Sequence, residues 1–363
     1  MGADKDHSDE IWEQFAYQVR RRVDGQADAL QDPRQPALLD AVVTADDFAQ
    51  LFGAAAADSV LYASKSVQVE HPGGLPQLCR DRIARNNFRY IPLSDRERDF
   101  VLLQALKRVD AGRLSKAGLE GKARWEAGWG ENYQNFVASN YDLSQLIPKY
   151  IHPDRPLRLW QNYILAQDAN FELNWYEIYR HWLFSTYLND YDHIYEFACG
   201  PCHNVVALAQ MFPDKSLFAL DWAQPSVEIA KLLHSVYGWN VSGLPFDFFH
   251  PDPQIKIQPN SAVITIGGLE QTGDHHAQFF DYLLEQRPAL VIHVEPFLEW
   301  YDEYNIVDYV AIRFHTVRNY LRGYIPRLME AEKEGRIQVV KANRCFFGSL
   351  FHDGYSLMIW KPV

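Results

Sequence analysis

One stretch in the middle of the chain combines an apolar run, a turn of small residues and a helical pattern. The apolar run covers residues 194–198 and predicts a short buried strand. The turn contains Gly200, and residues 205–211 have the apolar spacing of a helix. Because the amides at the start of such a helix point back into the turn, the three pieces together predict a cradle for a nucleotide-like ligand.

Two further apolar runs end in carboxylates that suit the same ligand. Residues 217–220 are followed by Asp221, which can accept both hydroxyls of a ribose. A third run ends at Asp247 and Phe248, where a carboxylate can accept from an exocyclic amine while a ring stacks on the base. A single acidic strand end is as often a helix cap, so the prediction of an adenosine site depends on the order and spacing of all three anchors.

The turn lacks the features of a dinucleotide site. The dinucleotide fingerprint G-x-G-x-x-G uses three glycines to bring the backbone close to a pyrophosphate, and this turn keeps only Gly200. We therefore disfavour NAD, and an NAD(P)-dependent oxidoreductase is the alternative to the prediction that follows.

Three anchors at successive strand ends, Glu196 with Gly200, then Asp221, then Asp247, resemble those of the class I S-adenosylmethionine-dependent methyltransferases. In that family the glycine loop faces an amino acid. The resemblance covers the chain from about Arg158 to its end, and it is strongest in the segments YEFACGPCHN, LDWAQPSVEIA, FDFFHPD, LEQTG, HVEP, RNYL and GYSLMIW. It implies an α/β fold with a Rossmann-like, doubly wound, seven-stranded sheet whose last strand is antiparallel, and it implies S-adenosylmethionine as the cofactor.

The anchors and the resemblance together assign the cofactor contacts. We expect them from Glu196, Ala198, Cys199, Gly200, Asn204, Asp221, Trp222, Asp247, Phe248, Gly267 and Tyr163. Two positions depart from the family, which usually has glycine where this chain has Ala198 and Cys202. The larger Cys202 is expected close to the methionine moiety, and it keeps open the alternative of a catalytically silent S-adenosylmethionine-binding module.

Polar residues after the fourth and fifth predicted strands, residues 262–266 and 290–294, supply the candidate catalytic groups. Transfer to a hydroxyl or an ammonium needs a general base, for which we select Glu270, Glu295 and His293. Glu295 has an alternative as the salt-bridge partner of Arg313 or Arg318. His293 lies inside an apolar strand and has an alternative as a core histidine.

Tyr301, His315 and Arg318 are the predicted substrate contacts, since His315 and Arg318 share one helical face. A divalent metal site, as in the catechol-type enzymes, would draw on Asp274, His275 and His276 together with His293 and Glu295. Adjacent histidines point in different directions, so no metal is predicted. The pair Cys199 and Cys202 has no second close pair to complete a zinc site, and it is not assigned a redox role.

Two domains are expected in a chain of 363 residues. Residues 1–150 are predicted to form a mainly helical lid or substrate domain, with helices at residues 11–23 and 95–109 and a charged, glycine-punctuated, exposed segment at residues 112–130. Residues 152–156 are the predicted linker, and residues 151–363 the cofactor-binding domain. A long helical stretch at residues 306–333 and a hairpin of residues 337–347 and 355–360 close the chain.

The composition limits the partners. A formal net charge of −12 opposes binding to nucleic acid, whose phosphates attract clustered Lys and Arg. No apolar run approaches the roughly 20 residues of a membrane span, and the polar start has no secretory signal, so a cytoplasmic protein is expected. A homodimer is left open. The predicted activity is methyl transfer from S-adenosylmethionine to an oxygen or nitrogen of a small polar metabolite, by in-line displacement with general-base assistance.

Overall fold

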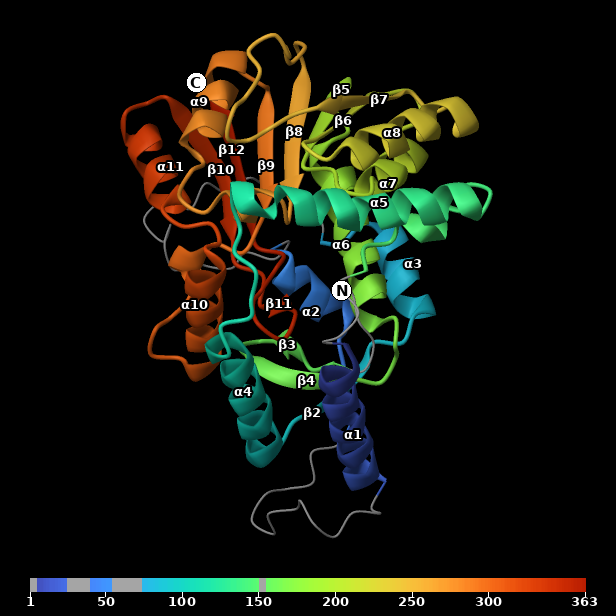
Figure 1. Cartoon of the computed structure of the whole chain (residues 1–363), viewed down its shortest axis with the longest axis vertical. Coiled ribbons are helices and arrows are strands. Elements are labelled where there is room, and N and C mark those ends of the chain that lie inside the picture. Colours follow the sequence, from blue (N-terminus) through green and yellow to red (C-terminus); the bar gives the residue numbers. More distant parts are fainter. Residues whose placement is uncertain (1–4, 25–39, 54–73, 150–154) are drawn as a thin grey trace.

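The computed structural model describes residues 5–24, 40–53, 74–149 and 155–363. Its largest element is a seven-stranded sheet in the order β10-β12-β9-β8-β5-β6-β7 (Figure 1). The strands are β5 (His193–Phe197), β6 (Ser216–Asp221), β7 (Val241–Pro245), β8 (Ser261–Ile266), β9 (Leu290–Val294), β10 (Ile337–Asn343) and β12 (Leu357–Pro362).

Five neighbouring strands of this sheet, from β9 to β7, pair in parallel, and β12 runs antiparallel between β9 and β10. The sequence order departs from the spatial order at β5, which lies between β6 and β8. Such a reversal opens a crevice at the carboxyl ends of the strands. The predicted seven-stranded sheet with its last strand antiparallel is therefore confirmed.

Alternate side chains of the strands point to opposite faces, and each face is covered by helices. Ile194 and Ile292 pack on one side, with helices α6 (Phe171–Tyr187), α7 (His203–Met211) and α8 (Gln224–Tyr237). Tyr195 and Val291 pack on the other, with α9 (Ala277–Gln286) and α11 (Tyr324–Lys333). Because both faces are buried, the strands read as continuous apolar runs in the sequence.

The predicted helical stretch at residues 306–333 is two helices, α10 (Ile306–Arg318) and α11. The prediction missed the break at Asn319, which ends α10 with a positive φ of 55°, and at Gly323, which precedes α11 with a positive φ of 76°. The hairpin of β10 and β12 is confirmed, but its first strand stops at Asn343. Phe347 and Gly348 form β11 in a different sheet.

A second, antiparallel sheet has the order β1-β2-β4-β3-β11 and draws strands from distant parts of the chain. β1 (Ala41–Val42) and β2 (Arg89–Pro92) come from the first part, β3 (Leu157–Leu159) and β4 (Asn162–Ala166) from the middle, and β11 from near the end. The predicted division at residue 150 stays a prediction, and residues 152–154 of the predicted linker lie outside the described ranges.

Helices make up most of the described residues in the first part of the chain. They are α1 (Lys5–Val23), α2 (Ala45–Leu51), α3 (Gln77–Arg85), α4 (Asp95–Asp110) and α5 (Lys122–Ala138). The predicted helices at residues 11–23 and 95–109 are confirmed by α1 and α4, and the reciprocal hydrogen bonds of Ser94 and Glu97 explain the start of α4. In the described ranges, no helix has the length and apolar character needed to cross a membrane.

A buried cluster of two arginines and two aspartates joins the second sheet to the segments that flank β10 and β12. Arg158 of β3 contacts Asp308 at 2.7 Å and Asp353 at 2.9 Å, and Arg344 contacts the same two carboxylates at 2.6 and 2.7 Å. Arg158, Asp308 and Asp353 are at most 1% exposed. Each charge is therefore compensated within the cluster, and the removal of any one leaves another uncompensated away from water.

We expect Arg158→Met to lower the free energy of unfolding by about 3–5 kcal/mol, because it leaves two buried carboxylates with one cation. Chemical denaturation measures this. Arg313→Met is the matched control, since Arg313 pairs with Asp110 at the surface and its loss should cost at most about 1 kcal/mol. Equal losses in the two variants would contradict the role given to the cluster.

Candidate functional site

The loop between β5 and α7 holds three alternate residues in the left-handed conformation. The φ angles are 56° at Ala198, 52° at Gly200 and 61° at Cys202. The structure therefore keeps the backbone of a three-glycine loop although only Gly200 is a glycine, and each side chain there costs about 1–2 kcal/mol. A local conformation this unfavourable persists only where the surrounding structure holds it.

The side chain of Cys202 points away from the ligand side of this loop. The thiol is fully buried, lies 3.5 Å from the carbonyl oxygen of Ser226 at the start of α8, and lies 3.8 Å from Cys199 Sγ. Cys202 was expected close to the methionine moiety, and the structure directs its thiol toward α8 and leaves it out of the cavity wall described below. Both cysteines are free thiols.

Asp221, at the end of β6, fixes the loop in place. Its Oδ2 accepts from Gly200 N at 2.8 Å and its Oδ1 accepts from Ala223 N at 2.8 Å. The side chain is 3% exposed, and burial raises its pKa to about 6 although both amides lower it. Each carboxylate oxygen has a second lone pair, so Asp221 can still accept from a ligand.

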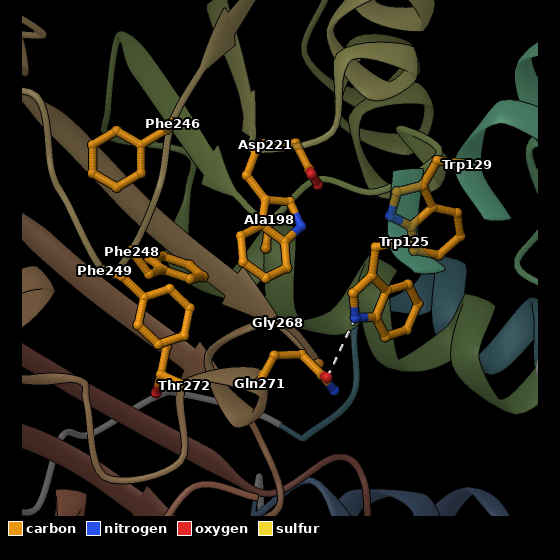
Figure 2. Close-up of a pocket in the computed structure, with 12 residues that line it drawn as sticks. Trp125, Trp129, Ala198, Asp221, Phe246, Phe248, Phe249, Gly268, Gln271 and Thr272 are labelled. Atoms are coloured by element: carbon orange, nitrogen blue, oxygen red, sulfur yellow. Dashed lines mark hydrogen bonds between the residues drawn. The ribbon is translucent and has the colours of Figure 1, made fainter. Parts of the chain in front are cut away.

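A cavity lies above this loop, between the carboxyl ends of the strands and α5 (Figure 2). It has about 530 Å³ of space including its open mouth, within the range of small-molecule sites. Aromatic rings make up half of its wall. The lining residues are Trp125, Trp129, Ala198, Asp221, Trp222, Phe246, Phe248, Phe249, Gly267, Gly268, Gln271 and Thr272.

Five predicted cofactor residues line this cavity: Ala198, Asp221, Trp222, Phe248 and Gly267. Trp222 stacks on Phe249 with ring centroids 5.9 Å apart, so aromatic rings meet where a base is expected. Asp247 is not part of the wall. Its Oδ1 accepts from Phe249 N at 2.8 Å, which makes it a turn residue that sets the position of the neighbouring rings.

The other predicted cofactor residues lie behind the loop or elsewhere. Glu196 is buried, accepts from Asn204 Nδ2 at 2.7 Å, and has its pKa raised by burial to about 8. Cys199 donates its backbone N–H to Leu220 O. Tyr163 is in β4 of the second sheet and donates to Leu350 O, so the structure does not bring it to the cavity.

Helix α5 supplies two cavity residues that the sequence analysis missed. Residues 112–130 were expected to be exposed, but their second half starts α5, which crosses one end of the large sheet (Figure 1). Trp125 and Trp129 are one turn apart and stack at 5.2 Å, and Trp125 Nε1 donates to Gln271 Oε1 at 3.3 Å (Figure 2). The i, i+4 spacing of two tryptophans was the available signal.

Two predicted general bases have structural roles. Glu295 accepts from the amides of Gly268, Leu269 and Glu270 at 3.0–3.1 Å and is fully buried, so it fixes the η3 turn (Leu269–Thr272) after β8. It forms no salt bridge to Arg313 or Arg318, which have other partners. The selection of Glu295 as a general base is corrected accordingly, because its carboxylate already accepts from three amides.

His293 is the core histidine that was its alternative. It lies between Thr265 Oγ1 at 2.9 Å and Tyr324 OH at 2.7 Å, and burial lowers its pKa to about 3. His293 does not line the cavity. A histidine with both ring nitrogens occupied in the core does not act as the base.

Glu270 is the predicted base that is hydrogen-bonded to a residue of the cavity wall. Its Oε1 accepts from Nε2 of the wall residue Gln271 at 2.8 Å. Burial, and next the charge of Glu295, raise its pKa to about 8, against the lowering effect of Arg318. Glu270 therefore lies one side chain behind the wall.

The predicted substrate residues Tyr301, His315 and Arg318 belong to one aromatic and cationic cluster, but not to the wall. The rings of Tyr301 and His315 are 5.5 Å apart, His315 Nε2 is 3.1 Å from His352 Nδ1, and Arg318 donates to Tyr320 OH at 2.8 Å. Among the described residues, no group of three His, Cys, Asp or Glu is placed to hold a metal ion.

No protein-family model matches the chain, and no curated protein matches its sequence. Solved structures overlap with parts of it. One is the [4+2]-cyclase SpnF, with 11% identity over 69% of this chain and 98% of that chain and a TM-score of 0.47. Another is geranyl diphosphate methyltransferase in complex with SAM, with 8% identity over 54% of this chain and 92% of that chain and a TM-score of 0.39. A third is the O-methyltransferase NcsB1 from neocarzinostatin biosynthesis, in complex with S-adenosyl-L-homocysteine and 1,4-dihydroxy-2-naphthoic acid. It has 16% identity over 53% of this chain and 58% of that chain, with a TM-score of 0.37.

These overlaps have low identities and TM-scores below 0.5, so they carry no argument about activity. The class of fold follows from the sheet itself. The parallel strands reverse their order at β5, β12 is inserted antiparallel beside β9, and a loop of three left-handed residues follows β5. These features agree with the fold that the sequence analysis expected from the resemblance to the class I S-adenosylmethionine-dependent methyltransferases.

Ala198 and Gly268 are expected to be energetically coupled. A Cβ built on Gly268 overlaps the Cβ of Ala198, so Gly268→Ala should lower the free energy of unfolding by about 1–3 kcal/mol. Ala198→Gly removes the strain of a left-handed alanine and should raise the free energy of unfolding by about 1 kcal/mol. In the double variant the overlap is gone, and its stability should approach that of Ala198→Gly. Chemical denaturation of the ligand-free proteins measures the cycle, and simple additivity would contradict the contact.

Proposed function

We propose that this protein is an S-adenosylmethionine-dependent methyltransferase that acts on an oxygen or nitrogen of a small metabolite. The observation that carries the proposal is that Asp221, which lines the aromatic cavity, also accepts a hydrogen bond from Gly200 N of the loop. It joins a ribose-type carboxylate to a loop with the backbone of three glycines. The absence of the dinucleotide glycine pattern opposes the NAD(P)-dependent alternative.

The cavity suits the nucleoside part of S-adenosylmethionine. Asp221 would accept the ribose hydroxyls, and Trp222, Phe246 and Phe248 would enclose the base. Ala198 and Gly267 would form the floor beneath the sulfur. When bound, S-adenosylmethionine supplies a methyl carbon on a sulfonium, an electrophile that needs an aligned nucleophile and little further activation.

The chain's own contribution to transfer would be alignment and exclusion of water. Trp125 and Trp129 close one side of the cavity, and Gln271 and Thr272 are the uncharged polar groups of its wall. Asp221 is the only carboxylate among the described lining residues, and it is engaged by two amides. An acceptor held here would be desolvated and oriented.

Glu270 is the group we propose to take a proton from the acceptor. Its contact with Gln271 connects it to the wall, and a carboxyl with a pKa near 8 is a stronger base than an ordinary glutamate. Since Gln271 stands between Glu270 and the cavity, its side chain would have to turn away for direct proton transfer. The size of the cavity and the net charge of −12 both favour a metabolite over a nucleic acid as acceptor.

Calorimetry with S-adenosylmethionine, S-adenosylhomocysteine and NAD tests the proposal. We expect both sulfur compounds to bind and NAD to produce no heat. A single-turnover reaction of the protein with methyl-labelled cofactor and a metabolite extract should then give a labelled product. Binding without transfer would favour the catalytically silent module, and tight NAD binding without a response to the sulfur compounds would overturn the proposal.

The affinity for S-adenosylmethionine should fall as the pH decreases through about 6. The ionised carboxylate of Asp221 would accept hydrogen bonds from the ribose hydroxyls. Because its pKa is raised to about 6, it becomes protonated near pH 6, whereas an ordinary aspartate becomes protonated near pH 4. Binding at about pH 5 should be about tenfold weaker than at about pH 8. Asp221→Asn should bind weakly with no such pH dependence, and an unchanged profile in this variant would show that another group titrates.

A further inference from the structure

Trp129 occupies the space that Gly200 leaves open. A Cβ built on Gly200 would lie 3.0 Å from Cζ2 and 3.3 Å from Cε2 of the Trp129 ring. A left-handed glycine in a ligand loop lets another group approach the backbone closely. In this protein the approaching group is a side chain of α5, so a ligand that is to contact the loop at Gly200 must first displace the indole.

The helix that carries Trp129 is weakened on both sides of it. Gly128 and Gly130 are interior residues of α5, where glycine costs about 1 kcal/mol relative to alanine. No packing contact explains them. A Cβ on Gly128 would meet nothing within 4 Å, and one on Gly130 would only touch Pro225 Cγ at 3.9 Å. Alanine fits at both positions, yet the chain has glycine.

Hydrogen bonds join this part of α5 to the rest of the site, and the ring of Trp129 packs against Gly200. Trp125 Nε1 donates to Gln271 Oε1 at 3.3 Å, and Glu126 Oε2 accepts from Gln224 N at the start of α8 at 3.1 Å. Trp125 and Trp129 are only partly buried. Local opening is favoured where buried apolar contacts are few.

We propose that Trp129 is a specificity-determining residue that controls which ligands reach the glycine loop, and that Gly128 and Gly130 allow α5 to release it. This inference rests on the proposed function. With the ribose at Asp221, the substituent on the ribose 5′ carbon extends toward the loop that Trp129 covers. Ligands with no amino-acid chain fit with Trp129 in place, whereas those that carry the chain require its displacement.

Four ligands test this by calorimetry: adenosine, 5′-methylthioadenosine, S-adenosylhomocysteine and S-adenosylmethionine. In Trp129→Ala the two ligands with an amino-acid chain should bind about tenfold more tightly than in the wild type, a gain of about 1.4 kcal/mol. Adenosine and 5′-methylthioadenosine should bind as before. Trp239→Ala, which removes a tryptophan just after α8 and away from the cavity, is the control and should change no affinity.

The double variant Gly128→Ala with Gly130→Ala should act in the opposite direction. A stiffer α5 should weaken binding of S-adenosylmethionine and S-adenosylhomocysteine by about tenfold and slow amide hydrogen exchange across residues 125–133. Ser235→Ala, which replaces an exposed residue of α8 by a better helix former, is the control for helix stabilisation elsewhere and should leave the affinities unchanged.

Several results would overturn the inference. A loss of S-adenosylmethionine affinity in Trp129→Ala would make Trp129 a contact residue. Equal changes in affinity for all four ligands would show that Trp129 does not select against the amino-acid part of the ligand. An unchanged affinity and exchange rate in the double glycine variant would remove the role of the two glycines. If no adenosine compound binds the wild type or any variant, the proposed function fails first, and the two failures are thereby distinguished.

Discussion

The loop between β5 and α7 depends on one carboxylate. Asp221 holds Gly200 N from the end of the neighbouring strand, and the three alternate left-handed residues of the loop persist with two side chains that oppose this conformation. The strain is accommodated by specific space: Cys202 is directed into α8, and the methyl group of Ala198 occupies the place where Gly268 has no side chain. The loop is thus accommodated by space left for the side chains of Ala198 and Cys202.

Most acidic residues around the cavity form hydrogen bonds within the protein and do not line the cavity. Glu295 accepts hydrogen bonds from three amides and organises the backbone of η3, and Glu196 accepts one from Asn204 behind the loop, so neither lines the cavity. Glu270 differs because its partner Gln271 belongs to the wall. Asp221 is thus the carboxylate that both fixes the loop and lines the cavity, whereas Glu196, Glu270 and Glu295 lie behind the wall.

Much of the fold could be predicted from the sequence, because the strands β5, β6, β8 and β9 are buried on both faces and appear as apolar runs. Of the candidate site, Asp221 and Phe248 could be placed from the strand ends they follow. Glu295 and His293 were misassigned because a sequence shows which strand a residue ends, not which amides or hydroxyls already satisfy it. Trp125 and Trp129 were missed because charged residues and glycines around them hid a helix whose position depends on tertiary contacts.

The second sheet has a consequence for the order in which the chain can assemble. Its central strands β3 and β4 are flanked by β2 from the first part of the chain and by β11 from the hairpin region, so neither edge is satisfied locally. During synthesis, β2 and β4 can pair well before β11 emerges, and until then β3 presents an open edge. An unpaired strand edge is a template for pairing with other chains, so the arrival of β11 both completes the sheet and covers this edge of β3.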